Sequence, residues 1–382
     1  MLPLLTQGGG AEKYFIELAR YLGDHGYDAD VVTLDEQFFK KFARMLHIFV
    51  LGNFFRKVDV GGREKEESVR RRLGSAKWLK VPRKNLGKTL ANYDAIYSKN
   101  EIVDLMMLKM IGYKKIPPVV IGVHTPIFYP RTDSFMSKLH NFLYAGAIYG
   151  WMINGARCFH VSNQFTEEFV NKKFGLKSKL VYYPFSVGEI DRISGEKRSA
   201  INFDSGKINI IFIGRLSEQK GVGRLASIIE SISKNQKIAQ KIKINIFGSG
   251  TPAEEALVKG LENKFGLVKY FGHIPHDYVP SLLKSHQLMI ATSSWEILPY
   301  TILEAQGLGL PVIAFDIPGP SDIVKNGETG FLVKNEKEFL EKIVSFVEGK
   351  YDFDREKIIG RIREKFDPEK IYGEMIKLFE NT

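Results

Sequence analysis

The sequence has very little cysteine. Among 382 residues there is one, Cys158, so no disulfide can form within the chain and a reducing compartment is expected. Long apolar runs are also missing: no stretch of about 18 residues is uninterrupted by polar side chains, so a transmembrane span is not expected. No signal peptide is recognisable either. We therefore expect a cytoplasmic protein that could lie peripherally on the inner face of a membrane.

The first half of the chain is short of acidic residues. Residues 1–185 contain 28 Lys and Arg against 17 Asp and Glu, a net charge of +11, whereas residues 186–382 contain 27 of each sign. Residues 56–88 alone hold 12 basic and 4 acidic residues. Such a segment attracts anionic lipid, nucleic acid or a phosphorylated acceptor, unless it is a solvated loop.

The length and composition predict a folded protein with two domains. A chain of 382 residues exceeds one ordinary core, and 44% hydrophobic with 26% charged residues is typical of globular proteins. In the second half, short apolar runs alternate with helical segments, which predicts a parallel sheet covered on both faces. The expected strands are 208–213, 243–247, 268–271, 288–291, 312–315 and 331–333.

The first half is expected to be a second α/β domain, spanning residues 1–185. A glycine-rich turn, Gly8-Gly9-Gly10, precedes a helix that extends to Gly23, and glycines there let a backbone approach a ligand closely. Residues 186–207 are polar and are expected to form a linker, followed by a domain at 208–350 and a helical region at 351–382. The first-half strands are expected at 30–34, 95–98, 119–123, 158–162 and 179–183.

Two aromatic-rich segments of the first half have alternative interpretations. Residues 42–55 are strongly apolar between basic residues, and are either a core helix or a segment that lies in a membrane interface. Residues 139–153 are predicted to form a second helix of this kind, at an interface or lining an acceptor site.

A candidate anion site follows the strand at 288–291. Pro299 favours the first turn of a helix, so the chain is expected to leave the strand, turn and begin a helix there. The free backbone N–H groups of Tyr300 and Thr301 would then point out of the positive helix end and bind a phosphate.

Two carboxylates flank this anion site. Glu296 is expected in the turn and Glu304 inside the helix, and carboxylates accept hydrogen bonds from sugar hydroxyls. A ligand combining phosphate and sugar, such as a nucleotide sugar, fits both features. The two glutamates, seven residues apart and followed by Gly309 and Pro311, resemble the signature of the GT-B-fold retaining glycosyltransferases of family 4.

A basic turn earlier in the chain supports this resemblance. Arg215 and Lys220 lie in the turn after the strand at 208–213, where a guanidinium fork and an ammonium group can converge on a diphosphate. The resemblance implies that this pair holds the donor diphosphate as it leaves. His124, at the end of the strand at 119–123, is implied to face the transferred sugar.

The resemblance implies an α/β GT-B fold in which two Rossmann-like domains face each other across a cleft. Glu296 would bind hydroxyls of the transferred sugar and Glu304 the nucleotide ribose. Ile297 and Leu298 stand where the family usually has a small and an aromatic residue. The remaining donor-binding positions that it implies are Gly8, Gly9, Gly10, Gly214, Gly248, Ile274, Leu298, Pro299, Tyr300 and Thr301.

Competing motifs are rejected. Gly87-Lys88-Thr89 resembles a phosphate loop, but proline stands at position 82 where that motif requires glycine. Asp28-Ala-Asp30 has the spacing of the metal-binding motif of GT-A glycosyltransferases. It precedes a strand instead of following one, which favours a surface loop. His273 and His276 have no further candidate ligands nearby, so we expect neither a metal nor another cofactor.

The sequence favours a retaining, metal-independent hexosyltransferase that uses a nucleotide diphosphate sugar and modifies a glycan or lipid-linked acceptor at a membrane surface. A soluble transferase acting on a small sugar is one alternative. A non-catalytic nucleotide-sugar-binding subunit is another. Nucleic acid is not an expected partner.

Overall fold

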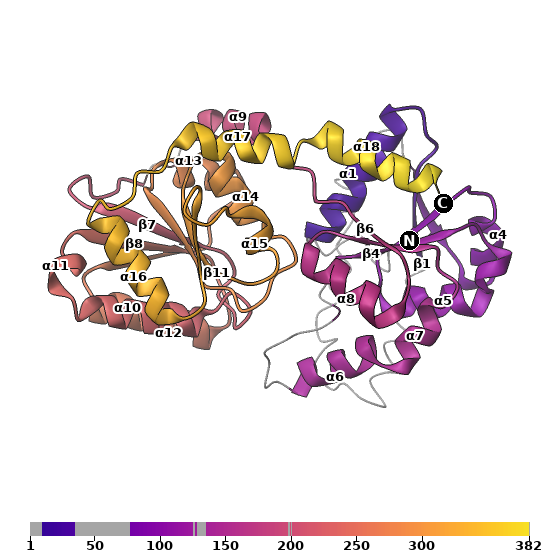
Figure 1. The fold of residues 1–382 in the computed structure, drawn as a ribbon, viewed down its shortest axis with the longest axis horizontal. Helices are drawn as coiled ribbons and strands as arrows, with labels where there is room; N and C mark the ends of the chain where they lie inside the picture. The colour runs from indigo at the N-terminus through magenta and orange to yellow at the C-terminus, as the bar shows by residue number, and fades with distance from the viewer. Residues whose placement is uncertain are drawn as a thin grey trace.

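The computed structural model describes residues 10–34, 77–124, 127, 135–197, 199 and 201–381. Figure 1 shows two α/β lobes side by side, with the last helices of the chain running along both. All strands within the described residues pair in parallel, which confirms the predicted α/β class. Gly8, Gly9, the segment 42–55 and most of the basic segment 56–88 lie outside the described residues.

The second lobe is built on a six-stranded sheet with the strand order β12-β11-β10-β7-β8-β9. Every strand lies within one residue of its predicted position. The strands are β7 (Ile208–Ile213), β8 (Ile242–Phe247), β9 (Val268–Gly272), β10 (Leu288–Ala291), β11 (Val312–Phe315) and β12 (Gly330–Val333).

Both faces of this sheet are covered over most of its strands, which explains why those strands are largely apolar. In β7, Ile211 packs in one hydrophobic cluster while Ile210 and Phe212 pack in the other. Helices α10, α12 and α16 contribute to the second cluster, and α9, α13 and α14 to the first. The helices are α9 (Val187–Glu196), α10 (Val222–Ser233), α11 (Gln236–Ala239), α12 (Pro252–Lys264), α13 (Val279–Lys284), α14 (Tyr300–Gly307), α15 (Pro320–Ile323) and α16 (Glu336–Val347).

The first lobe contains a four-stranded sheet, in the order β3-β4-β5-β6, and a separate pair, β1 with β2. Its strands are β1 (Asp30–Leu34), β2 (Lys77–Val81), β3 (Ile96–Ser98), β4 (Val119–Val123), β5 (Cys158–Val161) and β6 (Ser178–Leu180). Its helices are α1 (Gly10–Asp24), α4 (Leu86–Leu90), α5 (Ile102–Ile111), α6 (Phe135–Ala145), α7 (Ala147–Ile153) and α8 (Gln164–Phe174). Cys158 is buried in β5, as a small apolar residue would be.

The structure corrects two expectations and adds one strand. Residues 139–153 are not one helix, because Gly146 is extended (φ −89°, ψ 175°) and separates α6 from α7. The strand expected at 179–183 covers only Ser178–Leu180, as β6. Within the expected linker, 186–207, Val187–Glu196 forms α9. Strand β2 lies within the basic segment, where the sequence predicts no strand.

The chain ends in two helices that connect the lobes, α17 (Arg355–Lys365) and α18 (Pro368–Glu380). In Figure 1 α17 lies over the second lobe and α18 beside α1 of the first. The Tyr21 hydroxyl donates to Glu369 at 2.6 Å, and the Tyr21 ring stacks on that of Tyr372. One hydrophobic cluster contains residues of α1, α14 and α18 together, so the packing spans both lobes.

Candidate active site

Glycines bring three turns together at the carboxyl ends of β7, β8 and β10. A Cβ added to Gly248 would lie 1.8 Å from the carbonyl oxygen of Gly214, and one added to Gly221 would lie 1.9 Å from that of Thr292. Gly248 and Gly221 also have φ values of +139° and +70°, which other residues rarely adopt. Only glycine therefore fits at these contacts, and the carboxyl edge is where open α/β sheets place their ligands.

Lys220 and Glu296 meet at this edge. The Lys220 ammonium group lies 2.6 Å from Glu296 Oε1, and the Ser293 hydroxyl donates to the same oxygen at 2.8 Å. The Lys220 side chain is 17% exposed and that of Glu296 is 8% exposed, so water screens the pair only weakly. The two predicted residues, 76 positions apart in the sequence, thus form one contact.

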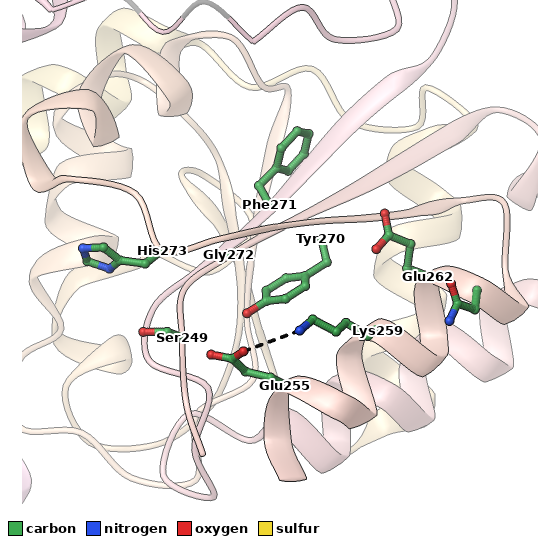
Figure 2. Close-up of a pocket in the computed structure, with 9 residues that line it drawn as sticks. Ser249, Glu255, Lys259, Glu262, Tyr270, Phe271, Gly272 and His273 are labelled. Atoms are coloured by element: carbon green, nitrogen blue, oxygen red, sulfur yellow. Dashed lines mark ion pairs between the residues drawn. The ribbon is translucent and has the colours of Figure 1, made fainter. Parts of the chain in front are cut away.

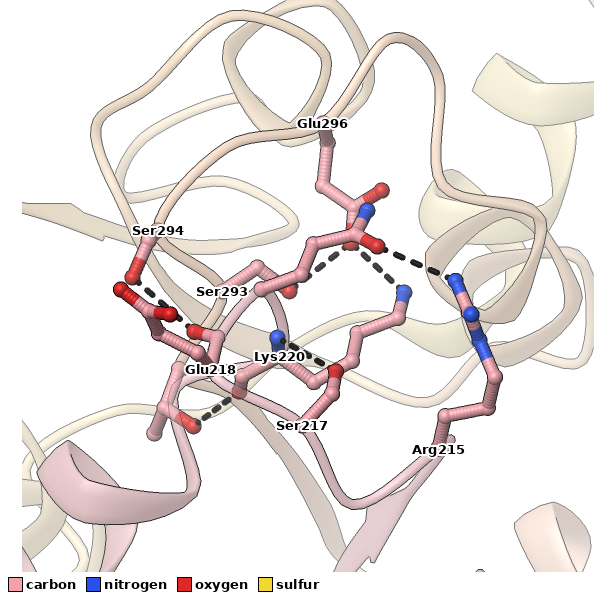
Figure 3. Close-up of polar contacts among 9 residues, drawn as sticks. Arg215, Ser217, Glu218, Lys220, Ser293, Ser294 and Glu296 are labelled. Carbon is pink, nitrogen blue, oxygen red and sulfur yellow. Dashed lines mark hydrogen bonds and ion pairs between the residues drawn. The ribbon is translucent and has the colours of Figure 1, made fainter. Parts of the chain in front are cut away.

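Arg215 belongs to the same loop. Its Nη2 atom donates to Gln219 Oε1 at 3.0 Å. Figure 3 shows the Arg215 and Lys220 side chains extending to the same side of the loop, below Glu296. The loop after β7 therefore presents two cations beside the carboxylate of Glu296 from the loop before α14, as a diphosphate joined to a sugar would require.

Helix α14 follows the loop that holds Glu296. Pro299 occupies the N-cap position, one residue before the helical turn in which the sequence places it, and Tyr300 is the first helical residue. The N–H groups of Tyr300 and Thr301 have no acceptor within the helix, because the first turn has no preceding carbonyls. The predicted helix start is therefore present, and binding of an anion to it stays a prediction.

Glu304 lies one turn further along α14 and is buried. Its Oε1 atom lies 3.0 Å from Nε2 of His276, whose side chain is 66% exposed. Sequence reasoning considers His276 only as a metal ligand and misses this contact, because the loop after β9 cannot be placed against α14 from spacing alone. Ile274, from the same loop, packs against the hydrophobic cluster that contains α14.

Leu298 is buried in the same cluster, in the loop that also holds Glu296. The first lobe holds this loop by one hydrogen bond, in which Asn163 Nδ2 donates to the carbonyl oxygen of Ile297 at 3.0 Å. Asn163 also accepts from the N–H of Thr166 at 2.8 Å and so caps α8. The sequence analysis does not single out this residue.

His124 lies in the first lobe, buried at the end of β4. Its Nε2 atom is 2.9 Å from the Tyr97 hydroxyl and its Nδ1 atom is 2.9 Å from the Tyr183 hydroxyl. The Tyr183 ring stacks on that of Tyr300, with centroids 5.8 Å apart. His124 is therefore linked to the start of α14 through one aromatic ring.

A pocket of about 590 Å³ opens to solvent along the outer side of β9 (Figure 2). Ser249 and His273 come from the turns after β8 and β9, so this end of the pocket adjoins the carboxyl edge of the sheet. The other lining residues are Glu255, Lys259, Glu262, Asn263, Tyr270, Phe271 and Gly272.

Neither a metal cluster nor a membrane span is found in the part of the chain that the structure describes. No three His, Cys, Asp or Glu side chains there could hold a metal ion together. None of the helices within the described ranges combines the length and hydropathy that crossing a bilayer requires.

Comparison with known proteins identifies the family. Residues 194–365 match the model of the glycosyl transferases group 1, and residues 8–184 match that of glycosyltransferase family 4. Together the two matches cover most of the chain. The chain belongs to the group 1 glycosyltransferases.

Solved structures show the GT-B fold of this group. Anabaena Alr3699/HepE in complex with UDP superposes with a TM-score of 0.71 at 18% identity, covering 99% of this chain and 98% of that one. A glycosyltransferase from Rickettsia africae superposes with a TM-score of 0.68 at 16% identity, covering 100% and 96% of the two chains. The predicted GT-B architecture of two Rossmann-like domains is thereby confirmed.

Curated relatives of this glycosyltransferase match over shorter segments. The Escherichia coli UDP-Gal:alpha-D-GlcNAc-diphosphoundecaprenol alpha-1,3-galactosyltransferase is 30% identical over 158 residues, which is 41% of this chain and 37% of that protein. An uncharacterized 41.2 kDa protein in the cps region of Klebsiella pneumoniae is 30% identical over 162 residues, 42% of each chain. The matched segments thus span less than half the length of these relatives.

Proposed function

We propose that this glycosyltransferase moves a hexose from a nucleotide diphosphate sugar to a hydroxyl of a glycan or lipid-linked acceptor, with retention at the anomeric carbon. The observation that carries this proposal is the contact between Lys220 and Glu296, with Arg215 on the loop of Lys220 and the N-terminus of α14 directly after the loop of Glu296. A diphosphate and a sugar hydroxyl are the groups that these side chains would bind together.

The chemistry follows from where charge develops. The bond between the anomeric carbon and the phosphate oxygen breaks, and a bond to the acceptor oxygen forms on the same face of the sugar. Negative charge grows on the leaving diphosphate, where Arg215 and Lys220 stabilise it and to which the acceptor proton is transferred. Glu296 holds hydroxyls of the sugar and Glu304 the ribose, so neither carboxylate acts as a nucleophile. Because the protein supplies the cations, this proposed transfer is metal-independent.

The names of similar proteins suggest which substrates to test first. HepE has been crystallised with UDP and with UDP-glucose, so UDP-hexoses head the donor panel. The name of the E. coli relative specifies a sugar carried on diphosphoundecaprenol, which makes a polyprenyl-diphosphate sugar the first acceptor to test.

We also propose that the first lobe contacts an anionic membrane surface from the cytoplasmic side. Four of the eight large hydrophobic side chains that are exposed among the described residues lie on α5, α6 and α7, which lie together in Figure 1. They are Met110, Phe142, Ile148 and Trp151. Lys109 lies 5.4 Å from the centre of the Trp151 ring, so a cation borders the apolar side chains, as an interfacial surface requires.

Transfer is tested by incubating the protein with a panel of nucleotide sugars and acceptors and measuring release of the nucleoside diphosphate. NMR of the product then gives the anomeric configuration, and chelator tests the metal independence. We expect one donor to be turned over, with retention, in the presence of chelator. Donor binding without turnover of any acceptor would instead favour a non-catalytic subunit.

Flotation with vesicles tests the membrane contact. Binding is expected to vesicles that contain phosphatidylglycerol and to be weak with neutral vesicles, because the lobe is basic. Trp151→Ser should reduce flotation, whereas Leu257→Ser, at an exposed position of α12, should not. Equal flotation with neutral vesicles, or full activity on a water-soluble acceptor without lipid, would favour the soluble alternative.

A further inference from the structure

Four polar rings, those of His160, Tyr97, His124 and Tyr183, form a hydrogen-bonded row in the first lobe. Strand pairing places Tyr97 beside Val120, and His160 beside Gly122. Residues two apart in a strand share a face, so Tyr97, Gly122 and His160 lie on one side of the sheet. A Cβ added to Gly122 would lie 2.3 Å from the Tyr97 hydroxyl oxygen. The absence of a side chain at Gly122 therefore lets the Tyr97 ring cross β4 and reach His160 and His124.

The carbonyl oxygen of Val181, which His160 contacts at one end of the row, determines the direction of each hydrogen bond in the row. His160 Nε2 lies 2.8 Å from the carbonyl oxygen of Val181, which can only accept, so this nitrogen carries a proton. In a neutral ring Nδ1 is then bare, and the Tyr97 hydroxyl must donate to it. The oxygen of Tyr97 is left to accept from Nε2 of His124. Nδ1 of His124 is then bare and accepts the hydroxyl proton of Tyr183.

Both histidine rings are neutral. Burial lowers the pKa of His160 from 6.5 to about 4. Burial, and to a smaller extent the neighbouring His160 and Lys99, hold the pKa of His124 well below its usual value. The other ionisable groups packed around the two rings are Tyr14, Tyr97 and Tyr183, whose pKa values burial raises.

We propose that this row holds His124 as the tautomer protonated at Nε2, with both ring nitrogens occupied. Tyr97, His160 and Tyr183 are then positioning residues for His124. This inference rests on the proposed function, together with the implication of the family resemblance that His124 faces the transferred sugar. It implies that His124 is held there as a neutral ring that exchanges no proton with the substrate. The charge of the diphosphate is then stabilised by Arg215 and Lys220 and not by His124.

Ring ¹⁵N NMR tests the tautomer without any turnover. His286 is an internal control, because its Nδ1 atom lies 2.6 Å from the carbonyl oxygen of Leu282 and so carries the proton, giving the opposite tautomer. Burial also lowers the pKa of His286 to about 4. We expect His124 and His160, assigned with His→Gln variants, to be protonated at Nε2 and not to titrate between about pH 5.5 and about pH 8. A His124 ring that titrates in this range, or that carries its proton on Nδ1, overturns the proposal.

Two substitutions perturb the row in different ways. Tyr97→Phe removes the hydroxyl, and Gly122→Ala pushes the Tyr97 ring aside without removing a polar group. Both should abolish the single Nε2-protonated signal of His124 and lower kcat roughly tenfold or more, with a smaller change in the KM of the donor. Gly360→Ala is the matched control, because a Cβ there meets nothing within 4 Å on α17.

The outcomes separate this inference from the proposed function. An unchanged His124 spectrum in both variants would overturn the positioning role, whatever happens to turnover. A wild-type protein that shows the Nε2 tautomer but transfers no sugar would overturn the proposed function and leave the hydrogen-bond assignment supported.

Discussion

Nζ of Lys220 lies 2.6 Å from Oε1 of Glu296, across the gap between the loop after β7 and the loop before α14. The pair holds two side chains in place before any donor binds. Preplaced charges stabilise a transition state without the cost of reorganising at the moment of reaction. Under the proposed function, the contact therefore fixes the Lys220 ammonium group where charge develops on the leaving diphosphate.

Replacing Lys220 with Ala should reduce kcat by about 10²- to 10³-fold, since one cation facing the leaving diphosphate is lost. The measurement is steady-state release of nucleoside diphosphate. Lys264→Ala is the matched control, because Lys264 pairs with Glu230 at 3.4 Å on the surface of the same lobe. Because Glu296 would be left buried without its cation, thermal unfolding must accompany the kinetics. A variant that stays folded and turns over normally would contradict the role given to Lys220.

Asn163 offers a test of the contact between the lobes. Asn163→Ser keeps an oxygen to cap α8 but removes the amide Nδ2 group that donates to Ile297, so the loop holding Glu296 loosens while the helix stays capped. We expect the donor KM to rise several-fold with little change in melting temperature. Asn163→Ala should raise the KM equally but lose about a further 1 kcal/mol of stability with the cap.

The control for this prediction is Asn335→Ala, which removes the side-chain cap of α16 in the second lobe. It should lower stability and leave the donor KM unchanged. If Asn163→Ser bound donor normally, the hydrogen bond to Ile297 would have no part in shaping the site.

The sequence predicts the second lobe well because most of its strands are buried on both faces. Continuous apolar runs such as Ile208–Ile213 then stand out from the amphipathic helices between them. Strand β2, Lys77–Val81, holds two lysines among three apolar residues and lies inside a basic segment, so its composition does not indicate a strand. Gly146 interrupts a run of apolar residues that sequence alone would continue as one helix.

The site is only partly predictable for a different reason. Lys220 and Glu296 can be proposed as neighbours from a family signature, although 76 positions separate them. The row from His160 to Tyr183 depends on which strands pair and in which register, and no local pattern encodes that. His160 looks from the sequence like an ordinary strand residue, and only its place opposite Gly122 reveals its contact with Tyr97.

Gly248→Ala should disrupt the donor site. The new Cβ would lie 1.8 Å from the carbonyl oxygen of Gly214, and the φ of +139° is unfavourable for alanine, so the turns after β7 and β8 must separate. We expect a loss of roughly 2 kcal/mol or more in the free energy of unfolding, and weaker donor binding measured by calorimetry. Gly260→Ala in α12, where a Cβ meets nothing within 4 Å, should be neutral or slightly stabilising. Equal stability of the two variants would show that the turns are not in backbone contact.

The buried carboxyl of Asp104 predicts an unusual pH dependence of stability. Burial raises its pKa from 3.8 to about 7, although the Ser98 hydroxyl donates to Oδ2 at 2.5 Å and lowers it. Between these two pKa values the folded protein binds more protons at this site than the unfolded chain does. The contribution of Asp104 to the free energy of unfolding therefore falls as pH rises from about 4 to about 7, and then levels off.

Asp104→Asn removes this titration. The variant should be more stable than the parent protein at about pH 8, by on the order of a few kcal/mol, and the difference should shrink towards pH 4. Chemical denaturation at several pH values measures it, with Asp28→Asn in an exposed turn as the control. A constant difference across this range would mean that Asp104 does not change protonation on unfolding. A difference that grew as pH fell would show that the carboxylate is stabilised, not penalised, by its surroundings.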